Sequence, residues 1–392
     1  MNIYKVVWQF SKMPFLVGYN SCPDNPEGVP NNLPFELFIE PQTGVLRQTK
    51  NAAVDQALTL MYEKGSVIGP AMEGSVHKSY CDDFLSFVSE HAQIAGNSFL
   101  EIGAGTGYLL SQLQDQGAVA LGIEPGASYA PNWERYKVDV IQGMFPHPNV
   151  AEQNFDCILS YAVMEHIVDY DQFLYSQIKL LDEGGILFVS VPDCEPYIRA
   201  ADPSCFVHEH YSYFTRDTLC KALRKVGLDV VACGSANYGG ALYAAAVKSS
   251  SKINFGGAES QGKESNFYPE CFENMLNFKA YWLDRYELLK SNNKTVGVYC
   301  PSRALNVLAS SMQLRFFDDD PSVYGKYLPG FESPIEAFAD LEEKLVDEVW
   351  VFSYTFGELI RQKLKNSSLL NKVTVLCVGD LETELSGQMH GC

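Results

Sequence analysis

Between residues 98 and 247, short apolar runs alternate with segments whose apolar residues recur every three or four positions. The runs are typical of buried strands and the longer spacing is typical of amphipathic helices. This alternation predicts an α/β domain with a mostly parallel sheet covered on both faces. We expect strands at 98–102, 118–123, 138–141, 154–160, 184–192, 228–236 and 240–247, and helices near 107–116, 170–182 and 216–226.

The flanking segments have other patterns. Residues 1–50 are rich in turn formers and contain a predicted β-hairpin (34–40 with 45–48), whereas 51–95 is mostly helical, with an amphipathic stretch from Asp82 to His91. A Gly- and Ser-rich stretch, 248–265, has the composition of a linker. We therefore expect four parts: a β-rich cap with a helical lead-in (1–75), the main α/β domain (76–250), a linker with a long helix (251–292) and a smaller Rossmann-like α/β domain (293–392).

The last two parts are predicted from their own periodicity. A helix over 268–291 would carry a stripe that we expect to be core: Phe272, Met275, Leu276, Phe278, Tyr281, Trp282, Tyr286 and Leu289. Strands are expected at 295–299, 314–317, 349–352 and 373–377, with a helix after Arg303. This second strand–turn–helix–strand pattern indicates a further open α/β sheet.

A glycine-rich turn follows the first strand of the main domain. Gly103, Gly105 and Gly107 occupy alternate positions after Glu101, and glycine allows positive φ and a close approach of ligand to backbone. A nicotinamide fingerprint would place its third glycine at Tyr108 instead. The next strand ends at Glu124, about 20 residues on, where doubly wound folds present an acid to ribose hydroxyls.

This loop resembles the cofactor loop of class I S-adenosylmethionine (SAM) methyltransferases. The resemblance implies a seven-stranded sheet that ends in two closing strands, and SAM as the cofactor. Because ligands bind at the carboxyl ends of the strands, we expect these residues to border SAM: Glu101, Gly103, Ala104, Gly105, Gly107, Tyr108, Glu124, Pro125, Gln142, Gly143, Ser160, Tyr161, Ala162 and His166. His166 could equally be structural or catalytic.

Charge and cysteine content limit the classes of binding partner and the cellular location that we expect. The chain of 392 residues has a net charge of −19, which disfavours nucleic acids and anionic membranes and leaves a small-molecule substrate. Its 11 cysteines are scattered without a C-x-x-C pair, so we expect no metal site and a reduced, cytoplasmic location. No apolar run reaches 18 residues, and the N-terminus lacks a signal-peptide core. The oligomeric state is left open.

The stretch from Phe206 to Phe214 contains His208, Glu209 and His210 in the loop after the fifth strand. In an extended chain the two histidines would share a face, and in a turn all three side chains could converge. The sequence favours a histidine base positioned by a carboxylate, with His210 as the base, Glu209 as its partner and His208 as the alternative. A helix-anchoring role for these residues is the competing interpretation.

The segment 207–214 also resembles the Y-H-E-H-x-S-Y-F motif of C-methyltransferases that act on nucleotide-linked deoxysugars. Residues 317–321, 325–330 and 333–335 resemble the D-x-N/D-P … G-x-x-x-P-G … P-I pattern of that family's C-terminal domain. The resemblance covers roughly 75–385. It implies an N-terminal zinc domain, a SAM domain, a Rossmann-like domain, and a histidine that deprotonates the carbon beside a keto group.

Several residues depart from the family pattern. Cys22 is alone where the family has zinc cysteines, and Val207, Ala162 and Tyr238 replace a tyrosine, an asparagine and a histidine. The C-terminal glycine turn becomes Cys-Pro-Ser-Arg (300–303). The leading hypothesis is C-methylation of a sugar-like or keto-bearing small molecule. The alternatives are an O- or N-methyltransferase of a specialised metabolite and a catalytically silent SAM-binding scaffold.

Overall fold

The computed structural model describes residues 6–15, 19–63, 75–248, 267–301, 305, 312–343, 346–352, 357–367 and 374–377. The chain divides into two compact units. The first contains 37–195 and the segment that begins at Glu209, and the second contains 7–36, 196–208 and the chain from Glu259 onward. Each unit is therefore built from segments that are discontinuous in the sequence.

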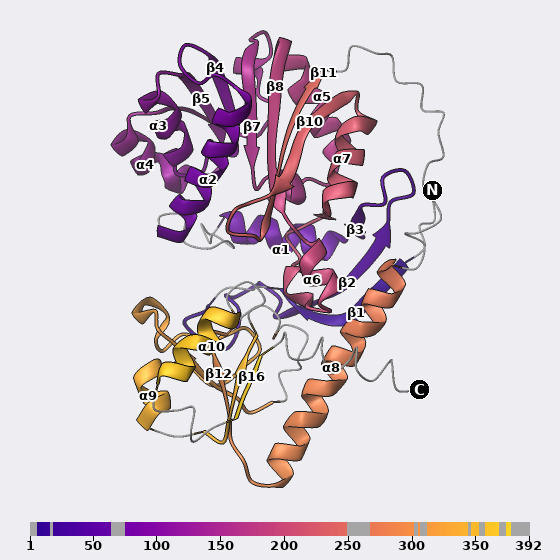
Figure 1. Cartoon of the computed structure of the whole chain (residues 1–392), viewed down its shortest axis with the longest axis vertical. Coiled ribbons are helices and arrows are strands. Elements are labelled where there is room, and N and C mark those ends of the chain that lie inside the picture. Colours follow the sequence, from indigo (N-terminus) through magenta and orange to yellow (C-terminus); the bar gives the residue numbers. More distant parts are fainter. Residues whose placement is uncertain are drawn as a thin grey trace. The chain divides into compact units, whose positions relative to one another are not determined.

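A seven-stranded sheet forms the centre of the first unit (Figure 1). Its order is β10-β11-β8-β7-β4-β5-β6, and β11 alone runs antiparallel to its neighbours β8 and β10. This is the expected class I methyltransferase sheet, with its two closing strands placed beside the fifth strand. The strands are β4 (Ser98–Ile102), β5 (Val119–Glu124), β6 (Asp139–Gln142), β7 (Phe155–Tyr161), β8 (Leu181–Pro192), β10 (Leu228–Ser235) and β11 (Ala241–Lys248).

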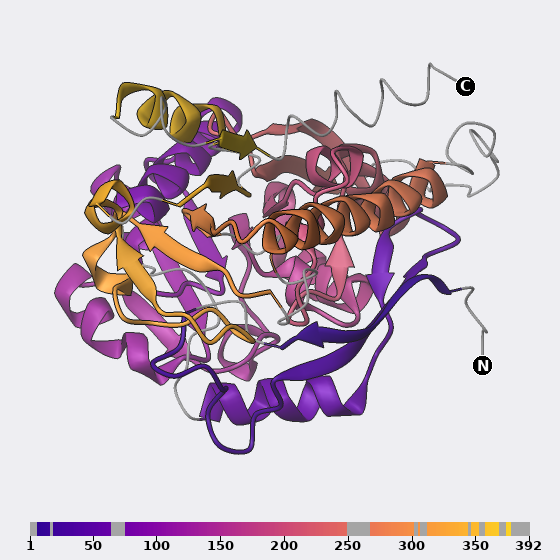
Figure 2. The ribbon, with the colours of Figure 1, turned by 90° about the horizontal axis from the view of Figure 1, so that it is seen from below.

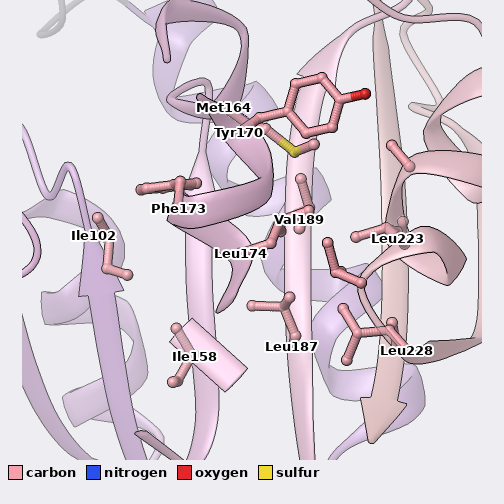
Figure 3. Packing of buried hydrophobic residues seen from close by; sticks show 14 of the residues in the cluster. Ile102, Ile158, Met164, Tyr170, Phe173, Leu174, Leu187, Val189, Leu223 and Leu228 are labelled. Carbon is pink, nitrogen blue, oxygen red and sulfur yellow. The ribbon is translucent and has the colours of Figure 1, made fainter. Parts of the chain in front are cut away.

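Helices cover both faces of this sheet (Figure 1). One face packs against α2 (Ser75–His91), α3 (Tyr108–Asp115) and α4 (Ala130–Tyr136), and the other against α5 (Tyr170–Leu180) and α7 (Arg216–Lys225). Figure 3 shows the second of these cores, where Leu174 of α5 and Leu223 of α7 lie over strand residues such as Leu187. Two apolar cores thus fix the sheet from both sides.

The predicted N-terminal hairpin is joined to the core of the first unit. In the first unit, the end of β2 (Asn32–Ile39) pairs with β3 (Leu46–Gln48), and β3 pairs with β9 (Ser212–Tyr213). Glu40 accepts hydrogen bonds from Thr43 and Tyr170 and pairs with Lys225 at 3.0 Å, and these contacts hold its pKa below the usual range despite its burial. Helix α1 (Ala52–Glu63) follows this hairpin.

The second unit contains a five-stranded parallel sheet of order β14-β13-β12-β15-β16. Its long helix α8 is continuous (orange in Figure 2), and Trp282 of α8 lies 4.6 Å from the ring of Trp350 on β15. Strand β1, the neighbour of β2 in its sheet, also belongs mainly to this unit. The elements are β1 (Val6–Pro14), α6 (Glu195–Arg199), α8 (Phe267–Ser291), β12 (Val296–Tyr299), β13 (Arg315–Asp318), β14 (Ile335–Ala337), α9 (Phe338–Glu343), β15 (Glu348–Val351), α10 (Gly357–Asn366) and β16 (Thr374–Cys377).

Several individual elements differ from the sequence prediction. Helix α5 ends at Leu180, because Leu181 already pairs with Phe155 in β8 and β7. Strand β1 crosses a region that was interpreted as turn-rich, and β14, α4 and α6 were not anticipated. Leu276 was expected in the buried stripe of α8 but is 54% exposed. The expected linker (248–265) and the helix after Arg303 lie almost entirely outside the described residues.

None of the described helices combines the length and apolar character that a membrane crossing needs.

Candidate functional site

The glycine loop after β4 has the conformation that its composition predicts. Gly103, Gly105 and Gly107 all have positive φ, at 78°, 50° and 78°. A Cβ atom on Gly103 would lie 2.4 Å from Cγ2 of Val163, and one on Gly107 would lie 2.7 Å from Cγ2 of Val138. Only glycine satisfies both the backbone angle and the packing at these two positions.

Glu124 ties this loop to the end of β5. One carboxylate oxygen accepts the Gly105 amide at 2.9 Å, and the other accepts the Gly126 amide at 2.8 Å. The side chain of Glu124 is buried, as is Trp133, whose indole donates to the Gly105 carbonyl at 2.8 Å. The acid therefore shapes the loop and retains lone pairs for a ligand, since a carboxylate offers about four acceptor positions.

Two further polar atoms at the ends of neighbouring strands are buried without a hydrogen-bond partner among the described residues. They are Oε2 of Glu101 on β4 and Oγ of Ser160 on β7. Burial, followed by the nearby charge of Glu124, raises the pKa of Glu101 well above its usual value. SAM carries an ammonium and a sulfonium, and a cation near Glu101 would satisfy its orphaned oxygen. This donor set fits SAM.

The remaining cofactor candidates lie at the same edge of the sheet. Gln142 pairs with Glu124 across β5 and β6, and the Gly143 amide donates to the Glu124 carbonyl at 3.0 Å. Pro125 follows Glu124 directly, and Ala104 donates its amide to the Ile123 carbonyl at 3.2 Å. Tyr108 begins α3, and its hydroxyl donates to Asp82 of α2 at 2.9 Å.

The end of β7 connects the glycine loop to the histidines. Ala162 has φ = 54°, a left-handed conformation that costs an alanine roughly 1 kcal/mol and suits asparagine better. Its amide donates to Ser190 on β8 at 3.0 Å, while Tyr161 packs beside Phe84. The next residue is Val163, which contacts Gly103, so the turn Met164–His166 begins directly against the loop.

Glu165, His166, Glu209 and His210 form one cluster. The imidazole rings of His166 and His210 meet edge to face with centroids 4.7 Å apart, and Nδ1 of His166 lies 3.1 Å from the Glu209 carbonyl oxygen. The Tyr211 amide donates to the Glu165 carbonyl at 2.7 Å, which holds the two segments together. His210 is 7% exposed, whereas the His166 side chain is 31% exposed.

The Glu165 carboxyl is the buried acid of this cluster. It lies 3.9 Å from Nε2 of His166, and burial, together with the charge of Glu209, raises its pKa to about 8. Potential ligand atoms of Glu165, His166 and His210 all lie within 4.8 Å of one another. Two imidazoles and a carboxylate can share a proton or hold a metal ion, so the geometry permits both kinds of chemistry.

The structure does not bring His208 into this cluster. Within the second unit, His208 packs against the rings of Phe15 and Phe35, and its Nε2 lies 3.2 Å from the Met13 carbonyl oxygen. Burial lowers its pKa to about 4, and its exposed fraction is 0%. A neutral, inaccessible ring of this kind anchors the segment, which argues against His208 as the alternative base.

A cluster of three tyrosines at β11, Tyr80, Tyr238 and Tyr243, was not anticipated from the sequence. Asp83 of α2 accepts hydrogen bonds from the Asn237 amide at 2.9 Å and from the Tyr243 hydroxyl at 3.2 Å. This fixes the turn that carries Tyr238, whose exposed ring lies against Tyr80. The polar position of Asp83 within the apolar face of α2 was the signal that could have revealed this contact.

The order of the strands, the loop and the acid at the end of β5 define a class I SAM-dependent methyltransferase domain. A comparison with protein families agrees, because residues 74–233 match the family described as a methyltransferase domain.

Two curated relatives extend the comparison. The C-methyltransferase NovU of Streptomyces niveus is 27% identical over 61% of this chain, and the match spans 62% of its own length. A ubiquinone biosynthesis O-methyltransferase of Nitrosospira multiformis is 23% identical over 37% of this chain and 68% of its own. Among solved structures, the glycopeptide N-methyltransferase MtfA complexed with SAM is 15% identical, with a TM-score of 0.35, over 43% of this chain and 93% of its own.

Proposed function

We propose that this protein is a SAM-dependent methyltransferase that methylates a carbon of a sugar-like or keto-bearing small molecule, with His210 as the general base. The observation that carries the proposal is the cluster of His166, His210, Glu165 and Glu209 beside the glycine loop. The similarity to NovU, a C-methyltransferase, over more than half of this chain supports the choice of carbon. A nucleotide-linked sugar is the narrower form of this proposal.

The first role of the chain is to hold the cofactor. Bound SAM supplies the methyl group as an electrophile. Gly103, Gly105 and Gly107 leave the backbone bare for it, and Glu124, which already accepts the Gly105 amide, would accept hydrogen bonds from its ribose hydroxyls. The buried Oε2 of Glu101 would face its positive charge, and a cation there would favour the carboxylate form of Glu101.

The second role is to remove a proton from the substrate. The ring of His210 packs edge to face on that of His166, and the latter is anchored to the Glu209 carbonyl. This contact fixes the orientation of both rings. When His210 accepts the proton, the carboxylate of Glu209 stabilises the imidazolium charge. The partly exposed His166 passes the proton to solvent.

The substrate side of the site differs from the sugar C-methyltransferase pattern, and this keeps a second candidate open. Val207 is 1% exposed and belongs to the second unit, so it replaces the family's tyrosine by a buried apolar side chain. Tyr238 is 57% exposed where the family has histidine. These changes, with the similarity to ubiquinone O-methyltransferases, favour O-methylation as the alternative.

Turnover with a panel of acceptors tests the proposal. The purified protein is incubated with SAM carrying a ¹³C-labelled methyl group and with nucleotide-linked keto-sugars, phenols and amines. We expect a product whose new carbon NMR signal is that of a methyl group on carbon. A methyl signal on oxygen or nitrogen would establish the alternative chemistry. Binding of SAM without turnover on any acceptor would favour the silent scaffold.

His210→Gln then tests the base with the best acceptor. Glutamine has similar size and polarity but does not accept the proton at neutral pH, so turnover should decrease by roughly 10²–10⁴-fold. SAM affinity should be unchanged, since the cofactor residues lie in the glycine loop and at Glu124. His91→Gln, at the end of α2, is the matched control.

Turnover of His210→Gln within about threefold of the control would remove His210 from catalysis and leave methyl transfer by proximity alone. Elemental analysis and turnover after chelation are measured in parallel. A metal ion bound in stoichiometric amount and required for turnover would replace the proton-transfer role of the cluster by a metal-binding one.

A further inference from the structure

Two cysteines meet on the face of the first unit that α7 covers. Cys220 lies on α7 and Cys233 on β10, and the two elements pack directly against each other. Both thiols are free and partly exposed, and both side chains line the same cavity. Nothing in the cofactor site or the histidine cluster uses either residue.

A β-bulge is what places Cys233 on this face. Val230 pairs with Ala246 and Ala232 with Ala245, so Val231 is an extra residue in β10. Beyond the bulge the alternation of side chains is reversed. Cys233 therefore packs into the core beneath α7, as does Val230, whereas Ala232 packs into the opposite core.

Two arginines lie beside the pair in an accessible cavity. Arg216 and Arg224 lie four residues before and after Cys220 on α7, and both line the same cavity of about 570 Å³ as the two cysteines. The neighbouring Cys233 side chain, followed by the charges of the two arginines, lowers the pKa of Cys220, although burial and Asp217 oppose this shift. Asp217 and Glu195 are the acids that line the same cavity.

We propose that Cys220 and Cys233 form a redox-active dithiol that hydrogen peroxide oxidises to an intramolecular disulfide. The Cys220 thiolate attacks one peroxide oxygen, the O–O bond breaks, and hydroxide leaves and is protonated to water. Cys220 is thereby oxidised by two electrons to a sulfenic acid. The Cys233 sulfur then attacks the Cys220 sulfur, the S–O bond breaks, and the departing hydroxide takes the Cys233 proton as a second water.

The geometry supports this order of events. Cys220 is the nucleophile because the arginines flank it on its own helix, and arginine or lysine neighbours favour the thiolate form. Cys233 remains a thiol, since the adjacent Cys220 raises its pKa, and it is in position to resolve the sulfenic acid. The resulting bond would fix α7 to the edge strand β10. The helix α7 begins after Thr215, which follows the segment with Glu209 and His210.

Peptide mapping tests the proposal on the full-length protein. The reduced protein is treated with a small excess of hydrogen peroxide, alkylated with N-ethylmaleimide, digested without reductant and examined by mass spectrometry. We expect a linked pair of peptides containing Cys220 and Cys233. During peroxide treatment, Cys220 should lose its reactivity toward N-ethylmaleimide at least tenfold faster than Cys81, a buried thiol whose pKa is raised by burial.

Two variants separate the roles. In Cys233→Ser, the oxidised Cys220 should persist as a sulfenic acid that dimedone captures, whereas Cys220→Ser should leave Cys233 reduced. Cys22→Ser, at an exposed site in the second unit, is the control and should still form the linked pair. The proposal is overturned if wild-type Cys220 and Cys233 remain alkylated at peroxide concentrations that oxidise Cys22, or if either one links to another cysteine instead. Because the wild-type map decides this alone, a variant that fails to fold does not affect the outcome.

Discussion

Replacement of Glu124 by alanine is the most direct test of the cofactor site. The carboxylate is buried at the end of β5, and each of its oxygens accepts one backbone amide, from Gly105 and from Gly126. Since a carboxylate has about four acceptor positions, roughly one on each oxygen remains for the ribose hydroxyls. The substitution removes both the ligand contacts and the anchor of the loop.

The expected size of the effect follows from these contacts. Loss of hydrogen bonds to a charged acceptor should cost about 1.5–3 kcal/mol of binding free energy. At about 1.4 kcal/mol per decade, the dissociation constant for SAM should rise by roughly ten- to a hundredfold. The two amides would also lose their acceptor, which should lower the free energy of unfolding by about 1–3 kcal/mol.

Calorimetric titration with SAM measures the first effect and thermal unfolding without SAM measures the second. Glu124→Gln is the informative intermediate, because it has similar volume and one acceptor oxygen but no charge. Glu134→Ala removes an exposed acid from α4 and serves as the control for net charge. If folded Glu124→Ala binds SAM within about threefold of Glu134→Ala, Glu124 does not hold the ribose and the assignment of the loop is wrong.

Two further predictions concern the loop and a buried acid. Gly103→Ala should weaken SAM binding by roughly tenfold or more, because the new Cβ would lie 2.4 Å from Val163 and the backbone is left-handed. Titration of the double variant Gly103→Ala/Val163→Ala should show only partial recovery of SAM affinity, because the strained backbone angle remains. Full recovery would contradict the backbone part of the argument. Burial raises the pKa of Asp202 from 3.8 to about 6, although hydrogen bonds from Ser204 oppose the shift. The associated stability is therefore present below pH 4 and is lost as the pH rises through about 6, by about 3 kcal/mol in total. The free energy of unfolding of Asp202→Asn, measured in urea, should not fall over this pH range. If the free energies of the variant and the wild type change with pH in parallel, the prediction is wrong.

The sequence determined the cofactor half of the site because that chemistry is local. Three alternate glycines after Glu101 need positive φ whatever packs around them, and the structure has this conformation at all three. Glu124 lies at the end of the next strand, and neighbouring parallel strands end at the same edge of the sheet. The strands and helices of the main sheet were predictable for the same reason, because the spacing of apolar residues in each depends only on residues a few positions apart.

Contacts between distant segments were decided by the tertiary structure. The pairing of His166 with His210 joins two turns 44 residues apart, and it depends on how β7, β8 and β9 are placed. The motif alone treated His208 and His210 as alternatives, yet packing assigns them to different units and buries His208 completely. A single extra residue in β10 turned Cys233 toward Cys220, and no hydrophobic pattern in the sequence marked that bulge. Strand pairing, burial and a bulge are properties of the folded chain, and they determine which of the candidate side chains can react together.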